Sequence, residues 1–272
     1  MAEIVPQREP PLTRADRERQ RAPLGMLLLH LVLLRHQANA SDAALRDRLS
    51  KRVHFVHVGK TGGGTIRSVL GALCDCTPLQ VHVRPVSTKE VSARLIVSVR
   101  DPVDRVLSSF NWRHPLRGGD IYCPSRSCGS NVRERELEKE LYNCFDTVND
   151  FAEALSQSHF CGLVARRALT EGVGHLGKGF RYYFEDVLHL LPNMTFKLVN
   201  TESFDKDLRC ALRWLGFPAN AVDALEYEHK HREYPGKNET FLSPKARRNL
   251  ELFLIDDTFY LSELERYADR EC

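Results

Sequence analysis

A glycine-rich loop with one lysine is the segment of this 272-residue sequence that is best suited to chemistry. Residues 59–65 read Gly-Lys-Thr-Gly-Gly-Gly-Thr. Consecutive glycines allow backbone N–H groups to turn inward around an anion, and a helix that follows them contributes the positive end of its dipole. Lys60 adds a full positive charge, and Thr61 and Thr65 add hydroxyl donors. The pattern predicts a cradle for a phosphate or a similar anion.

An ATP or GTP site is the first alternative for such a loop. The Walker sequence requires a glycine five positions before the glycine of Gly-Lys-Thr, and that position holds His54. Arg100-Asp101 follows a later apolar run, so an arginine stands where a magnesium-binding strand would end directly in a carboxylate. Both features disfavour kinase and NTPase chemistry, which depends on magnesium.

Two apolar runs rich in β-branched residues, 53–58 and 94–99, predict the buried strands that position these residues. A helix is expected over 65–73, and a second helix is expected to begin with Asp101 as its cap and Pro102 at its first position. Later patterns predict helices at about 146–157, 180–191, 205–215 and from Ser243 onward, with a strand at 195–199.

Alternating buried strands and helices indicate an α/β fold. We expect a P-loop-like three-layer domain with a central, mainly parallel sheet flanked by helices. In such domains ligands bind at the carboxyl ends of the strands. The chemistry is therefore expected after Val58 and after Val99.

Two segments resemble the PAPS-dependent sulfotransferases, especially the Golgi glycan branch that includes the heparan sulfate O-sulfotransferases. FVHVGKTGGGTIRSVL (55–70) is similar to their 5′-phosphosulfate loop, which commonly reads His-x-Pro-Lys-Thr-Gly-Gly-Thr. IVSVRDPVDRVLSSF (96–110) is similar to their 3′-phosphate element, in which Arg-Asp-Pro precedes a helical serine. LVNTESFDKDL (198–208) is a weaker match to a strand–acid–helix segment of these domains, and the resemblance spans about residues 53–265.

The resemblance implies transfer of a sulfuryl group from PAPS (3′-phosphoadenosine 5′-phosphosulfate) to a hydroxyl of a carbohydrate, without a metal. Lys60 would neutralise the charge that develops on the bridging oxygen as PAP leaves. Arg100 and Ser108 would bind the 3′-phosphate, which distinguishes PAPS from ATP. The residues expected to hold the 5′ end are Thr61, Gly62, Gly63, Gly64 and Thr65. Gly59 replaces the usual proline, and together with the additional Gly64 it predicts a loop more flexible than is typical.

The acceptor hydroxyl must lose a proton, so a general base is expected near the sulfuryl group. His82 lies between the two nucleotide elements, where several heparan sulfate sulfotransferases carry a catalytic histidine, and histidine titrates near neutral pH. A structural role for His82 is the alternative. His57 is the second candidate, although its position just before the loop favours a positioning role. Other branches of the family use a glutamate.

The N-terminal segment, residues 1–40, predicts entry into the secretory pathway. Several arginines precede the apolar run 24–34, and Ala38-Asn39-Ala40 follows it as a possible cleavage site. The run is too short for an ordinary membrane-spanning helix, which needs about 20 residues. A cleaved signal peptide would leave a Golgi lumenal enzyme, whereas an uncleaved signal-anchor through 24–34 would make a single-pass type II Golgi membrane protein, and both stay open. An ordinary amphipathic or buried helix is the third alternative.

Sequons and cysteines agree with an oxidising compartment. Asn193 and Asn238 each begin an Asn-x-Thr sequon. The eight cysteines are an even number, as disulfide frameworks require, and three of them fall in a polar segment at about 113–145 that we expect to be a surface insertion of a 41–272 catalytic domain. Zinc is the alternative, but the spacings Cys74-x-Cys76 and Cys123-x4-Cys128 do not match a paired Cys-x-x-Cys site.

The charge balance selects no partner. A formal net charge of +3 is too small to indicate nucleic-acid binding. The expected partner is a glycan or another hydroxyl acceptor. A nucleotide-binding kinase or NTPase and a non-catalytic glycan-binding relative are the alternatives, and the latter predicts loss of Lys60 or Arg100, which are both present.

Overall fold

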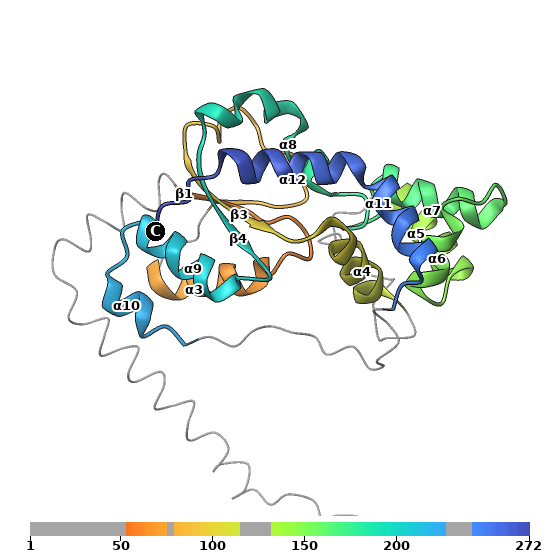
Figure 1. Ribbon diagram of the computed structural model, residues 1–272, viewed down its shortest axis with the longest axis horizontal. Coiled ribbons are helices and arrows are strands. Elements are labelled where there is room, and N and C mark those ends of the chain that lie inside the picture. Colours follow the sequence, from red (N-terminus) through yellow and green to blue (C-terminus); the bar gives the residue numbers. More distant parts are fainter. Residues whose placement is uncertain (1–52, 75–78, 115–131, 227–240) are drawn as a thin grey trace, which may run out of the picture. The chain divides into compact units, whose positions relative to one another are not determined.

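Four parallel strands form one sheet in the computed structural model of the protein (Figure 1). The strands are β1 (Val53–Val56), β2 (Leu79–Val81), β3 (Arg94–Val99) and β4 (Thr195–Asn200), and their order across the sheet is β2-β1-β3-β4. Phe55 of β1 is opposite Gln80 of β2 and Ile96 of β3, and Ile96 is opposite Lys197 of β4. The predicted parallel sheet is confirmed.

The structure describes residues 53–74, 79–114, 132–226 and 241–272. The segment 1–40, the cysteines 76, 123 and 128, and Asn238 lie outside these residues. Within the described part of the chain, none of the helices has the length and apolar character needed to cross a membrane.

Helices connect and cover the strands. In chain order they are α3 (Gly63–Cys74), α4 (Pro102–Arg113), α5 (Val132–Cys144), α6 (Val148–Ala154), α7 (Phe160–Thr170), α8 (Phe180–Phe184), the 3₁₀ helix η3 (Glu185–Asn193), α9 (Phe204–Trp214), α10 (Ala219–Asp223), α11 (Pro244–Phe253) and α12 (Ile255–Tyr267).

Helices lie on both faces of the sheet, as the predicted three-layer fold requires. Figure 1 shows α8 and α12 on one face and α3 and α9 on the other. On the first face, Val97 and Val99 pack with Phe184 and Leu264 in one apolar core. Burial on both faces explains why five of the six residues of β3 are buried.

A second apolar core lies among α4, α5, α6, α7 and α11. Leu137 and Leu141 of α5 are buried in it, and so is Phe145. The segment 113–145, which the sequence suggested was a surface insertion, therefore contributes its last third to the interior. The reason is that Leu137, Leu141 and Cys144 recur at spacings of four and three residues in the second half of α5, a helical pattern that the charged residues around it obscure.

Local sequence explains where the helices near the sheet begin. The Asp101 carboxylate accepts the N–H of Asp104 and Pro102 occupies the first turn, so α4 starts as predicted. The carbonyl of Gly62 accepts the N–H groups of Thr65 and Ile66, and α3 consequently begins at Gly63, two residues before the predicted start. Ser243 caps α11 through the N–H of Ala246.

The strand order creates a switch point beside the predicted loop. The chain leaves β1 for β2 on one side and later returns to β3 on the other side of β1. Connections from β1 and β3 therefore diverge, and the carboxyl ends of strands at such a point are where ligands of open α/β sheets bind. Residues 57–62 and Arg100 both lie at these ends.

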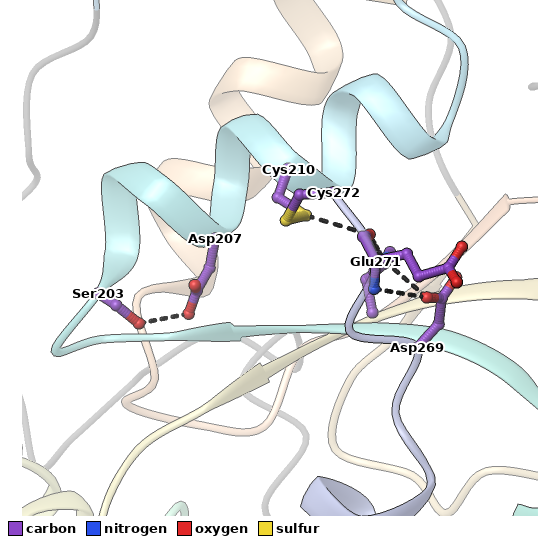
Figure 2. The surroundings of a disulfide bond; sticks show 7 residues. Ser203, Asp207, Cys210, Asp269, Glu271 and Cys272 are labelled. Carbon is purple, nitrogen blue, oxygen red and sulfur yellow. Dashed lines mark hydrogen bonds and ion pairs between the residues drawn. A yellow bond between two sulfur atoms is a disulfide. The ribbon is translucent and has the colours of Figure 1, made fainter.

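The C-terminal residues lie against β4, the edge strand of the sheet that is farthest from β2 (Figure 2). Cys272 forms a disulfide with Cys210 of α9, and the N–H of Asp269 donates to the carbonyl of Phe196 in β4. The buried amine of Lys197 pairs with the Asp269 carboxylate at 3.0 Å. A second disulfide joins Cys144 and Cys161. The expected use of cysteines in disulfides is confirmed for these four.

Candidate anion-binding site

The loop between β1 and α3 has two residues in the left-handed conformation. Lys60 has φ 70° and Gly62 has φ 77°. Glycine adopts this region freely, whereas a lysine there is uncommon and is retained when the surrounding structure requires it. The loop turns sharply between the end of β1 and the first turn of α3, so the N-terminus of that 12-residue helix, with its first N–H groups, lies close to the carboxyl end of β1.

Thr61 has a structural role that the sequence did not reveal. Its hydroxyl donates to the carbonyl of Val58 at 2.5 Å and lies 2.6 Å from the hydroxyl of Ser98 in β3. Both side chains are fully buried. The single hydroxyl proton of Thr61 is thus used inside the protein, and what Thr61 can offer an anion is its backbone N–H. The bond to Ser98 ties the loop to the neighbouring strand.

Two glycines of the loop touch other elements closely. A Cβ on Gly62 would lie 2.8 Å from the ring of Phe204, and a Cβ on Gly63 would lie 1.9 Å from the ring of His57. Gly64 is exposed, with no atom within 4 Å of its hypothetical Cβ. Phe204 belongs to the segment 198–208, which therefore contacts the loop from the β4 side.

Arg100 lies at the end of β3, beside β1, and is half-buried. Among the described residues, its guanidinium makes no hydrogen bond and no ion pair. Ser108 is half-buried in α4, about 9 Å along the helix axis from Pro102. Trp112 is one turn further, on the same face of the helix as Ser108.

His82 directly follows β2, and its ring has a defined orientation. Its Nδ1 lies 2.9 Å from the carbonyl oxygen of His57. Since a carbonyl only accepts, Nδ1 carries a proton, and Nε2 is then the nitrogen of the neutral ring that can accept one. This tautomer is the one that a general base needs.

His57 has the opposite arrangement. Its Nδ1 lies 2.8 Å from Nε2 of Gln80, an amide donor, so the lone pair of His57 is already used. Burial, together with the charges of His82, Lys60 and Arg67, lowers the pKa of His57 to about 3. The ring stacks on His82 at a centroid distance of 4.2 Å. Of these two rings, the nitrogen whose lone pair is not used by a described hydrogen bond is therefore Nε2 of His82.

Two residues of the site were missed from the sequence. His175 lies 5.1 Å from His82 and 5.3 Å from Trp112, between ring centroids. The Trp112 ring lies 4.6 Å from the Lys60 amine, between the centroid and Nζ. A glycine-rich segment, Gly-Val-Gly-His-Leu-Gly-Lys-Gly at 172–179, was the available signal for His175. Trp112 follows Ser108 by four residues, a spacing that places both on one face of a helix, and this spacing was the available signal for Trp112.

The site therefore has cationic and aromatic character. His82, His57, Lys60 and Arg100 come from the adjacent ends of β2, β1 and β3. Within the described residues, no group of three or more His, Cys, Asp or Glu side chains is arranged to hold a metal ion. Asn193 of the first sequon is exposed at the end of η3, where a glycan can be accommodated.

Such an arrangement can bind an anion at the β1–α3 loop, a second anion at Arg100, and a proton at His82. Comparisons with protein-family models, with curated proteins and with solved structures found no match to this chain.

Proposed function

We propose that this protein is a PAPS-dependent sulfotransferase that acts on a hydroxyl of a glycan in the secretory pathway. The observation that carries the proposal is the position of Arg100 at the strand end next to the Lys60 loop. PAPS has a 5′-phosphosulfate and a 3′-phosphate, and a loop and an arginine at neighbouring strand ends offer donors to both.

The residues would act in one displacement step. His82 Nε2 takes the proton of the acceptor hydroxyl while the hydroxyl oxygen forms a bond to sulfur. The bond between sulfur and the bridging phosphate oxygen breaks, and Lys60 neutralises the charge that this oxygen gains. PAP leaves, and the sulfate ester stays on the acceptor. Positioning and electrostatics supply most of the catalysis in such a reaction.

The secretory compartment is supported by the two disulfides, which persist in oxidising surroundings. The glycan acceptor rests on the resemblance to the Golgi glycan branch. The segment 1–40 supplies the proposed signal peptide or signal-anchor.

The experiment is a binding and transfer assay with four variants. PAP, ADP and adenosine 5′-phosphosulfate are titrated calorimetrically, and sulfuryl transfer from labelled PAPS is followed over a panel of glycans. Arg100→Ala should weaken PAP binding by about 10–100-fold, because it removes charge-assisted hydrogen bonds, and should leave adenosine 5′-phosphosulfate binding unchanged. Lys60→Ala should mainly lower kcat.

Matched controls come from charged residues away from the site. Arg94→Ala removes an arginine from the opposite end of β3, and Lys89→Ala removes an exposed lysine before that strand. Neither should change PAP affinity. A parent protein that binds no PAP, or that turns over ATP with magnesium instead, would overturn the proposal.

A further inference from the structure

His175 and Gly59 occupy neighbouring positions that cannot both carry larger side chains. A Cβ on Gly59 would lie 2.2 Å from Nδ1, 2.4 Å from Cγ and 2.9 Å from Cβ of His175. Real Cβ atoms essentially never approach so closely, and the atoms involved are the Cβ of His175 and the part of the ring nearest to it, which cannot swing away as the end of a flexible side chain could. Gly59 does not have a positive φ, so alanine is compatible with its backbone. The space, and not the backbone conformation, requires glycine there.

The backbone of His175 cannot easily move away from Gly59. Arg105 of α4 is fully buried and donates to the carbonyl of His175 at 2.5 Å and to that of Leu176 at 3.2 Å. The guanidinium is itself paired with Asp257 of α12. Because this cation is buried, breaking its bonds to make room for a Cβ would leave donors unsatisfied.

The His175 ring in turn supports the rest of the site. It is tilted against His82 at an interplanar angle of 41° and against Trp112 at 33°. His82 thus lies between the rings of His57 and His175. Trp112 is placed between His175 and the amine of Lys60.

The imidazole of His175 is buried among other side chains and is uncharged at neutral pH. Its Nδ1 is buried and has no hydrogen-bond partner among the described residues. Burial, with the charges of His82, His57, Lys60 and Arg105, lowers the pKa of His175 well below its usual range. The ring is neutral and packed, which is the state of a spacer.

We infer that His175 is a positioning residue whose ring holds His82 and Trp112, and that position 59 is glycine to admit this ring. Its catalytic consequence rests on the proposed function. The substitution of the family's usual proline by Gly59 is then a fit to His175 and does not serve to make the loop flexible.

The first arm of the test is a double-mutant cycle on stability, which requires no ligand. Gly59→Ala should lower Tm by at least about 3 °C, since overpacking is destabilising. In the His175→Ala background the same alanine should lower Tm by less than half as much. The control Gly71→Ala, whose Cβ meets no atom within 4 Å and which lies inside α3, should not lower Tm in either background. Equal losses with and without the imidazole would overturn the shared-space inference.

The second arm separates positioning from folding. In a Trp214→Phe background, Trp112 is the one remaining tryptophan of the two in the sequence. His175→Ala should shift its fluorescence, and His175→Phe, which keeps an aromatic ring, should restore most of the parent spectrum. An unchanged spectrum in His175→Ala would contradict the contact.

The third arm measures catalysis on PAPS. His175→Ala should lower kcat by roughly 10–100-fold with PAP affinity within about threefold of the parent, because misplaced catalytic groups cost rate. His175→Phe should recover most of kcat. Loss of activity in both variants would overturn the spacer role in favour of a chemical one. If the parent binds no PAP, the proposed function fails while the first two arms still decide the role of His175.

Discussion

The three histidines of the site share one environment but make different contacts. His82 presents Nε2 as an acceptor, His57 accepts a hydrogen bond from Gln80, and His175 packs its ring between two others. The differences follow from which nitrogen each ring has already used. A residue type alone could not have separated these roles, because they depend on contacts from β1, β2 and the 172–179 segment.

The lowered pKa of His57 predicts a dependence of stability on pH. An unfolded histidine binds a proton below about pH 6.5, whereas folded His57 does so only near pH 3. The unfolded state therefore binds more protons across this window, and the free energy of unfolding falls as pH drops from 6.5 towards 3. Chemical denaturation at several pH values should show a shallower decline for His57→Gln, by up to about 1 kcal/mol per pH unit.

His189→Gln is the control for this measurement, since His189 is exposed on η3. It should keep the slope of the parent. Identical slopes in the parent and in His57→Gln would show that His57 is not held neutral by the fold.

At the scale of elements, α4 connects the site to the helical core. Its apolar residues Val106 and Phe110 pack in the helical core, while Arg105 reaches the loop that carries His175. Ser108 and Trp112 lie on the same helix. A small change in where α4 begins should consequently displace Ser108 and Trp112.

We predict that removal of the α4 cap weakens both stability and ligand binding. Asp101→Ala leaves the N–H of Asp104 without its partner and should cost about 1 kcal/mol of the free energy of unfolding. PAP affinity should fall as well, and Asp101→Asn should retain most of both properties. Denaturant unfolding and calorimetric titration of PAP provide the two measurements.

Thr147→Ala gives the comparison, because Thr147 caps α6 in the same way through the N–H of Asp150. It should lose a similar stability with PAP affinity unchanged. An equal loss of affinity in both variants would mean that α4 has no special link to the site.

The elements near the loop were predictable because their signals are local. The buried runs of β1 and β3, the glycines before α3 and the Asp-Pro start of α4 each act within a few residues. The positions of α5 and α12 were not predictable from the sequence. The apolar residues of α5 are surrounded by charged ones, and the place of α12 depends on its contacts with α8 and η3. In the site, Lys60 and Arg100 stand in motifs, but Ser98 and His175 join the loop only through pairing of distant segments.

At the scale of the whole described chain, two disulfides close loops of different length. Cys144–Cys161 closes a separation of 17 residues within the helical core, and Cys210–Cys272 closes one of 62 residues beside the sheet. The second disulfide also keeps Asp269 at the edge of β4, next to the buried amine of Lys197.

We predict that the two disulfides contribute unequally to stability. Loop-closure entropy assigns about 4 kcal/mol to the longer loop and about 3 kcal/mol to the shorter one. The variant Cys210→Ala/Cys272→Ala should therefore have a lower Tm than Cys144→Ala/Cys161→Ala, with the added cost of exposing Lys197. Thermal unfolding of the two variants compares them directly, and a reversed order would show that the C-terminal residues hold their place without the bond.

The shared space of Gly59 and His175 also limits the paths by which this sequence could change. A lineage that acquires a side chain at 59 while the imidazole is in place passes through an overpacked intermediate. A lineage that first replaces the histidine by a smaller residue does not. Relatives of this chain should consequently fall into two groups, glycine with histidine or a bulkier residue with a small partner, and the histidine should be the first of the pair to be lost.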